Sequence, residues 1–204
     1  SNSRARRSVS APTPPRRGNV PVALTSTVYT FDIELSDTDR GVYETLALRV
    51  ARHPSESEEF LVTRVLAYCL EYTEGLSFSN GLSDPDEPAL AVRDLTGVIK
   101  SWIEVGAPEA ARIHKASKAA PRVAVYTHKD AEKLAERWRG ERIHRADEVE
   151  LYAVDQALVA TLVASLQRRM SFALAVTSGH LYITLGERML EGAVQRYAWQ
   201  STDA

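Results

Sequence analysis

The stretch that decides the fold covers residues 93–120 and reads RDLTGVIKSWIEVGAPEAARIHKASKAA. Apolar side chains alternate along residues 99–105, which predicts a β-strand that is buried on one face and carries Glu104 near its end. Thr96-Gly97 predicts a tight turn before this strand, so Asp94 is expected at the end of the neighbouring strand. The pattern therefore predicts two carboxylates on adjacent strands.

The second half of the stretch predicts a helix that returns along the sheet. Pro108 suits the first helical position, because the N–H group that proline lacks would be unpaired there. Arg112 and Lys115 are three residues apart and share one stripe of this helix, and the rises of helix and strand bring Lys115 within reach of Glu104. Two acids and a lysine that meet suit phosphodiester hydrolysis assisted by Mg²⁺ or Mn²⁺, because carboxylate oxygens hold these ions and lysine stabilises charge on phosphate.

A plainer interpretation stays open for each of these residues. Glu104 also fits a surface acid at a strand end, Asp94 a turn residue and Lys115 a solvated helix position. Spacing alone does not choose between the two interpretations.

The composition predicts one acidic globular domain preceded by a basic tail. The chain has 204 residues, 44% of them hydrophobic, which is enough for a single hydrophobic core. Residues 1–19 are rich in Pro, Ser and Arg and are expected to be disordered, which leaves one domain over residues 20–204. The whole chain carries a net charge of −2 and the five arginines of the tail contribute +5, so the remainder carries −7.

A body this acidic predicts that any contact with nucleic acid uses a local basic groove, whereas the alternative partner is a protein. The candidates for such a groove are Arg112, Lys115, Lys118 and Arg122.

The cysteine and histidine content argues against disulfides and zinc. Cys69 is the only cysteine, which excludes a disulfide within the chain and favours a reducing compartment, so we expect a cytoplasmic protein. The five histidines lack the spacing of a zinc site. No apolar stretch of the length that an export signal needs follows the basic tail, and no membrane partner is expected.

The remaining chain predicts an α/β (α+β) fold with a mixed sheet flanked by helices. Residues 23–35 and 42–50 alternate and are joined by a turn, which predicts an N-terminal hairpin. Ser55 is expected to cap a helix that runs to about Tyr72. A strand over 122–126, reached by the central helix and therefore parallel to the strand of Glu104, is followed later by a C-terminal strand meander.

Several ordered motifs give this chain a resemblance to the YaeQ protein family. They are ARHPSE (51–56), DEP (86–88), DLTG (94–97), WIEVG (102–106) and RIHKA (112–116), with DTDRG (37–41) closing the first strand. This resemblance implies a variation on the PD-(D/E)XK nuclease-like core, in which a helix, three strands, a helix and a strand follow one another.

The resemblance also implies roles for particular acids. Asp94 resembles the metal-binding aspartate of that core, and Glu104 resembles the acid of its (D/E)XK element. Glu56 resembles the helix glutamate that many such nucleases add, with Glu59, one turn later, as its substitute.

The expected lysine departs from the nuclease pattern, because Gly106 stands two residues after the acid. Lys115 is the expected replacement from the following helix, and Lys100 is the weaker candidate. Asp86 and Glu87, in the acidic loop LSDPDEP, are expected as second-tier metal ligands beside Asp94.

Two functions follow from these observations. The first is Mg²⁺- or Mn²⁺-dependent hydrolysis of nucleic acid, with Glu56, Asp94 and Glu104 on the metal, Lys115 near the scissile phosphate and Arg112 as a further phosphate contact. The alternative is a catalytically inactive module that binds nucleic acid or a protein of the transcription machinery. The missing lysine and the acidic body favour this alternative.

Overall fold

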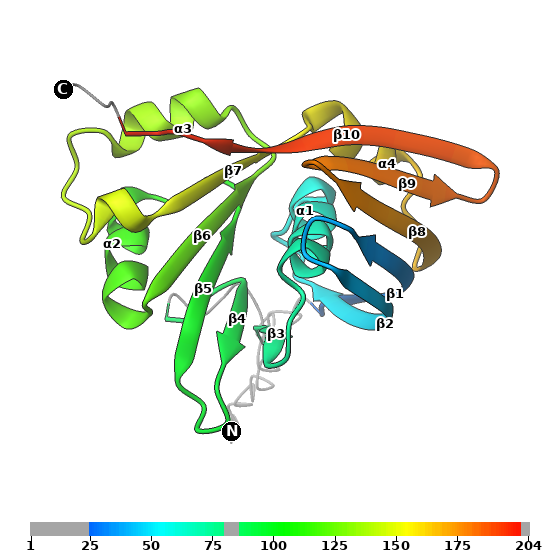
Figure 1. Cartoon of the computed structure of the whole chain (residues 1–204), viewed down its shortest axis with the longest axis horizontal. Helices are drawn as coiled ribbons and strands as arrows, with labels where there is room; N and C mark the ends of the chain where they lie inside the picture. The colour runs from blue at the N-terminus through cyan, green and yellow to red at the C-terminus, as the bar shows by residue number, and fades with distance from the viewer. Residues whose placement is uncertain (1–24, 80–85, 201–204) are drawn as a thin grey trace, which may run out of the picture.

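The computed structural model describes residues 25–79 and 86–200 (Figure 1). These residues form an α+β fold with one large mixed sheet, which confirms the predicted fold class. The basic tail expected over residues 1–19 and the first part of the acidic loop, residues 82–85, lie outside the described residues.

The described strands are β1 (Thr27–Asp37), β2 (Val42–Arg52), β3 (Leu76–Phe78), β4 (Leu90–Arg93), β5 (Ile99–Val105), β6 (Arg122–Thr127), β7 (Glu150–Val154), β8 (Arg169–Thr177), β9 (His180–Leu185) and β10 (Arg188–Tyr197). The described α-helices are α1 (Glu58–Glu71), α2 (Ala110–Ala119), α3 (Ala131–Trp138) and α4 (Gln156–Ala164). The predicted N-terminal hairpin, the strand of Glu104 and the C-terminal meander are all present.

The strands form one sheet in the order β2-β1-β8-β9-β10-β7-β6-β5-β4-β3. Only β1-β8, β5-β6 and β6-β7 are parallel pairs among the described strands, and the parallel pairing of β5 with β6 was predicted from the helical crossover. The sheet bends so that its two halves lie on either side of α1 (Figure 1). Apolar side chains of α1 and of both halves form the larger hydrophobic core.

A second core lies on the other face of β5, β6 and β7, under α2 and α3. Its largest side chains are Trp102, Trp138 and Trp199, and Trp138 meets Trp199 edge to face at 5.3 Å between ring centroids. Because successive side chains of β5 alternate between the two cores, Ile103 faces α1, whereas Trp102 and Glu104 face α2. The strand of Glu104 is therefore covered on both faces.

The two halves of the sheet are joined by β10, which changes partner along its length. Residues 188–193 pair with β9, whereas residues 194–197 pair with β7. At this change a Cβ atom on Gly192 would lie 2.8 Å from Leu158 Cβ and 2.9 Å from Asp155 Cβ. Glycine is therefore required at this position for α4 to pack against the strand.

Two predicted helix starts were wrong. Ser57, not Ser55, is the N-cap of α1, and its hydroxyl accepts a hydrogen bond from Phe60 N at 3.1 Å. Ser55 instead bonds to the ring of His53 at 2.6 Å in a turn that precedes the helix. Helix α2 starts at Ala110, because Pro108 belongs to the preceding loop, where its carbonyl accepts a bond from Trp138 Nε1 at 2.9 Å.

Candidate functional site

Glu104 is a buried acid that faces α2. Its Oε1 atom accepts hydrogen bonds from Trp102 Nε1 at 2.6 Å and from Arg112 Nε at 2.8 Å. Burial raises the pKa of the carboxyl group, and the Arg112 guanidinium opposes this effect. Arg112, not Lys115, is therefore the cation that reaches Glu104 from the helix, which corrects the expected pairing.

Arg112 also ties the helix to the acidic loop. Its Nη2 atom donates to the backbone oxygen of Glu87 at 2.7 Å. Lys115, one turn later, pairs with the carboxylate of Asp86, and both side chains of that pair are at least half exposed. The Glu87 side chain turns away from Glu104 and pairs with Arg93 at 3.2 Å.

Asp94 lies at the opposite end of β5 from Glu104. Its backbone N–H donates to the carbonyl of Val98, so the two residues face each other at the hairpin tip. Val98 precedes Glu104 by six positions, which separates the acids by roughly 20 Å along the strand. The structure does not bring these two predicted metal ligands together.

Asp94 instead holds the turn. Its Oδ1 atom accepts bonds from Thr96 Oγ1 at 2.6 Å, Thr96 N at 2.9 Å and Val98 N at 3.1 Å. The Thr96 hydroxyl is the largest cause of a pKa lowered to about 2. Lys100, the weaker lysine candidate, pairs with Asp94 at 3.3 Å and not with Glu104.

Glu56 lies on the other face of the sheet, before α1. Its carboxylate accepts a bond from His53 N at 2.8 Å and forms a buried ion pair with Arg64 at 3.2 Å. Burial raises the pKa of Glu56, whereas Arg64 lowers it. Glu59 lies in the first turn of α1.

The expected Mg²⁺ or Mn²⁺ ligands therefore do not share an ion. Asp94, Glu104 and Glu56 lie in three places, and the Glu104 carboxylate is already bound by a guanidinium. Among the described residues, no group of three or more His, Cys, Asp or Glu side chains is arranged to hold a metal.

A basic surface does form around α2. Residues 110–118 and 137–145 together contain seven Lys or Arg residues and one acid, Glu141. The two segments touch, because His144 N donates to the ring of His114 at 3.1 Å and Arg145 Nη2 donates to Ser117 O at 2.6 Å. We call this basic surface the α2 surface, and its cations are Arg112, Lys115, Lys118, Arg137, Arg139, Arg142 and Arg145.

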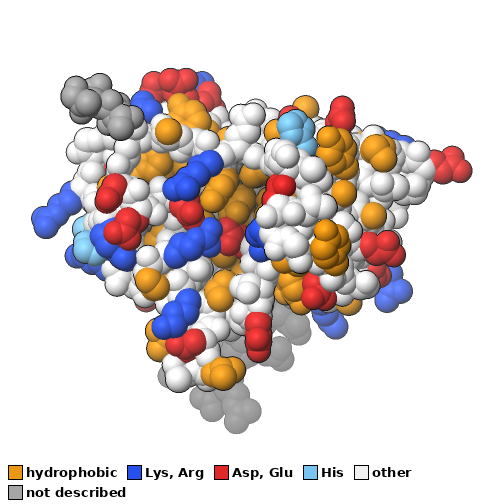
Figure 2. Space-filling model, viewed as in Figure 1, with side chains coloured by type: hydrophobic (Ala, Val, Ile, Leu, Met, Phe, Trp, Pro, Cys, Tyr) orange, Lys and Arg blue, Asp and Glu red, His pale blue; other side chains and the backbone are white. Residues whose placement is uncertain are grey.

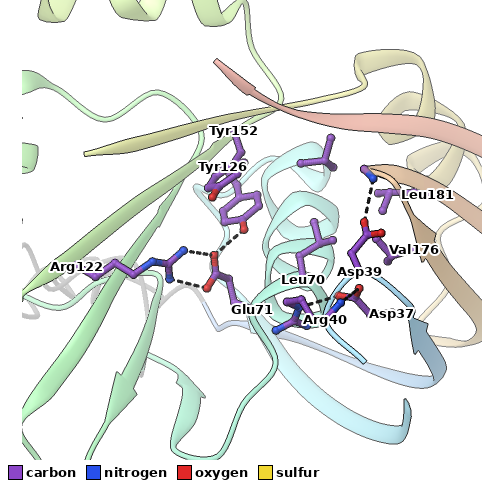
Figure 3. Close-up of a pocket in the computed structure, with 12 residues that line it drawn as sticks. Asp37, Asp39, Arg40, Leu70, Glu71, Arg122, Tyr126, Tyr152, Val176 and Leu181 are labelled. Atoms are coloured by element: carbon purple, nitrogen blue, oxygen red, sulfur yellow. Dashed lines mark hydrogen bonds and ion pairs between the residues drawn. The ribbon is translucent and has the colours of Figure 1, made fainter. Parts of the chain in front are cut away.

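Arg122, which was expected in the same groove, faces the other side of the sheet. It makes two bonds to Glu71, at 2.7 and 3.0 Å (Figure 3). It also pairs with Glu150 at 2.7 Å. The Tyr126 hydroxyl donates to the same Glu71 carboxylate at 2.6 Å. Arg122 thus belongs to a cleft between the two halves of the sheet.

This central cleft has a volume of about 240 Å³ and lies at the C-terminal end of α1. Figure 2 shows it as a hollow with apolar side chains inside and charged side chains around it. Its walls combine the stacked rings of Tyr126 and Tyr152, 4.8 Å apart, with aliphatic side chains of the other half of the sheet. The sequence named Arg122 for a basic groove and placed Asp37, Asp39 and Arg40 in the motif DTDRG, but it predicted no cleft, because the cleft is made by segments far apart in the chain.

The comparisons with known proteins bear on the whole described domain. The family model for the YaeQ protein matches residues 22–194 of this chain. The chain belongs to the YaeQ family. Its sequence is 31% identical to the YaeQ protein of Salmonella typhi over 182 residues, which is 88% of this chain and 98% of that protein. Against the YaeQ protein of Escherichia coli K12 the identity is 30% over the same shares.

Two solved YaeQ structures have the same fold. The crystal structure of YaeQ from Pseudomonas syringae gives a TM-score of 0.75 at 33% identity, covering 84% of this chain and 95% of that one. YaeQ from Xanthomonas axonopodis pv. citri gives a TM-score of 0.74 at 30% identity, covering 84% and 98%. No helix within the described residues of this YaeQ chain is long and apolar enough to span a membrane.

Proposed function

We propose that this YaeQ chain is a binding protein whose α2 surface contacts the phosphate backbone of a nucleic acid. The observation that supports this proposal is a gathering of seven cations in two segments that touch, on a body that is otherwise acidic. Four of these cations are ion-paired, with Glu104, Asp86, Glu109 and Glu148, whereas Lys118, Arg139 and Arg142 form no ion pair among the described residues. Lysine and arginine side chains that neutralise phosphates release the cations condensed on a nucleic acid, and this release favours binding.

The ion pairs on the α2 surface are compatible with exchange for phosphate. Lys115 and Asp86 are exposed by 51% and 70%, so their pair contributes little stability and a phosphate group can replace the carboxylate. Arg112 is different, because it is held by the buried Glu104 and fixes the position of the helix. Lys115, Lys118 and Arg142 are therefore the expected phosphate contacts.

The test is a titration of labelled single-stranded DNA, duplex DNA and RNA, followed by fluorescence anisotropy at several salt concentrations. The triple variant Lys115→Glu, Lys118→Glu, Arg142→Glu is expected to bind at least about tenfold more weakly, with a shallower dependence of affinity on salt.

A matched control reverses three exposed arginines elsewhere, Arg49, Arg169 and Arg188, and so makes the same change in net charge. This control is expected to retain most of the affinity. Equal losses in both triple variants would show that only net charge matters, and no binding by the wild-type chain would refute the proposal.

Metal-dependent hydrolysis on a PD-(D/E)XK-type core is the second candidate. The order α1, β3, β4, β5, α2, β6 supports this candidate, because a helix, three strands, a helix and a strand are the order expected of such a core. The antiparallel pairing of β4 with β5 also brings the Asp86–Glu87 loop beside the end of β5, where Glu104 lies. Hydrolysis at this place requires Arg112 to release Glu104. Incubation of labelled DNA and RNA with Mn²⁺, in parallel with Glu104→Gln, tests it: equal cleavage by both proteins would exclude Glu104 as a catalytic residue.

A further inference from the structure

Strand β2 forms one edge of the ten-stranded sheet (Figure 1). It pairs with β1 along its whole length without a shift of register. The N–H group of Thr30 on β1 donates to Arg168 O and so points away from Arg49, its partner on β2. Because bonding direction alternates along an antiparallel pair, the odd-numbered residues of β2 turn their N–H and C=O groups to the open edge.

The sequence of β2 lacks most devices that protect an edge strand. Residues 42–52, VYETLALRVAR, contain no proline, glycine or lysine, and no bulge interrupts the pairing with β1. The opposite edge is protected by its shortness, because β3 spans only Leu76–Phe78. Arg64 Nη2 donates to Ala51 O at 2.8 Å, so the open segment ends near this residue. A long and regular open edge is a template for another strand.

A second copy of the chain fits this edge by symmetry. Leu46 and Leu48 face the core, so the two cores continue into each other only when odd-numbered residues pair with odd-numbered residues. A twofold axis at Ala47, perpendicular to the sheet, meets this condition. It also places Tyr43, which is 64% exposed, opposite the small and exposed Ala51 of the second copy. A large side chain thus meets a small one on the outer face.

The same register brings opposite charges together. Arg49 of one copy lies opposite Thr45 of the other, and Thr45 pairs with Glu34 on β1. Arg49 and Glu34 are exposed on the outer face, two strand spacings or roughly 10 Å apart at the backbone, which two long side chains can span. Neither residue takes part in an ion pair among the described residues, so this contact replaces no existing pair.

We propose that β2 pairs antiparallel with β2 of a second copy, with Ala47 at the twofold axis, so that two sheets join into one. Backbone hydrogen bonds of residues 45–49 hold the copies together, and the contacts between Arg49 and Glu34 fix the register. One strand pair is a small contact, below the roughly 1,200 Å² of a stable interface, so the expected Kd is about 0.1 mM.

Sedimentation velocity on the full chain between about 10 µM and about 1 mM tests the proposal, because association in this range raises the mean sedimentation coefficient. Ala47→Lys places two lysines opposite each other at the axis and is expected to remain monomeric. Met189→Lys makes the same change in charge at a residue of β10 that is 69% exposed, so it is expected to associate like the wild type. A wild-type chain that stays monomeric would overturn the proposal and leave the edge to a strand of another protein. An Ala47→Lys variant that associates as strongly as the wild type would also overturn it.

A charge exchange tests the register. Arg49→Glu and Glu34→Arg each place like charges across the edge, so each is expected to weaken association at least about threefold. The two variants change the net charge in opposite directions, so an effect of net charge alone would move their affinities in opposite directions. The double variant has the wild-type net charge and opposite charges across the edge again, and it is expected to associate like the wild type. A double variant that associates more weakly than both single variants would contradict this pairing of the strands.

Discussion

Removal of Arg112 tests whether Glu104 is a structural partner of α2. In Arg112→Met the aliphatic part of the side chain is kept, while the Glu104 carboxylate, whose side chain is 5% exposed, loses its counter-charge. Breaking a buried ion pair costs about 3–5 kcal/mol. Because Arg112 is 28% exposed and Trp102 still donates to Glu104, we expect the lower end, about 3 kcal/mol. That loss is a large share of the stability of an ordinary domain.

Urea unfolding at pH 7, followed by circular dichroism, measures this loss, and the background Glu104→Gln provides the control. The neutral amide of that background needs no counter-charge, so Arg112→Met is expected to cost only about 1 kcal/mol there, mainly through the lost bond to Glu87 O.

The pH dependence has a defined sign. Without Arg112 the pKa of Glu104 in the folded state lies further above its value in the unfolded state. The contribution of Glu104 to folding stability is therefore fully present below the unfolded-state pKa and is lost as the pH rises through the folded-state pKa. The deficit of the variant should therefore shrink in acid. A cost below about 1 kcal/mol at pH 7, or an equal cost in both backgrounds, would refute this account of Glu104.

Three further predictions concern the other titratable groups. Glu56→Gln leaves Arg64 buried without a charged partner, so we expect a loss of about 3 kcal/mol in urea unfolding that Mn²⁺ does not change; a Mn²⁺-dependent loss would favour a metal role. His128 is 7% exposed, and burial lowers its pKa from 6.5 to about 4. This group therefore contributes stability on the order of 3 kcal/mol above pH 6.5, which is lost as the pH falls toward 4. In unfolding measurements across this range, His128→Phe should abolish that part of the pH dependence. Asp94→Ala should speed hydrogen exchange of the Thr96 amide while leaving global unfolding in urea nearly unchanged. Exchange as slow as in the wild type would contradict the role of Asp94 in the turn.

The position of Asp94 shows that the hairpin was predicted correctly but the neighbours of Glu104 were not. The turn at Thr96-Gly97 and the two flanking strands were predicted correctly. In a hairpin, however, the residue that enters the turn lies beside the start of the second strand, so Asp94 is far from Glu104 near the end of that strand. The same geometry places the residues that precede the first strand, Asp86 and Glu87, beside Glu104. The correct neighbours could therefore have been derived from the hairpin alone.

The central cleft could not have been derived in this way. Its walls meet because β1 pairs with β8 and β10 pairs with β7, contacts between segments far apart in the chain. Local alternation predicts each strand but not its partner, because any two apolar strands can pair and the choice depends on the packing of the whole sheet. The cations at 137–145 were missed for a similar reason, since only the folded chain shows that they lie against α2.

The packing of Glu104 and the exposure of the cations on α2 depend on each other. Glu104 is the residue on which the sequence suggested chemistry, yet both donors to its Oε1 atom belong to the packing of α2 on β5. Arg112 donates both to Glu104 Oε1 and to the backbone oxygen of Glu87, and these two contacts together fix the rotation of α2 about its axis. That rotation determines which side chains of the helix point outward, and Lys115 and Lys118 are among them. Loss of the Glu104 charge should therefore weaken binding of a polyanion indirectly, although the acid touches no phosphate.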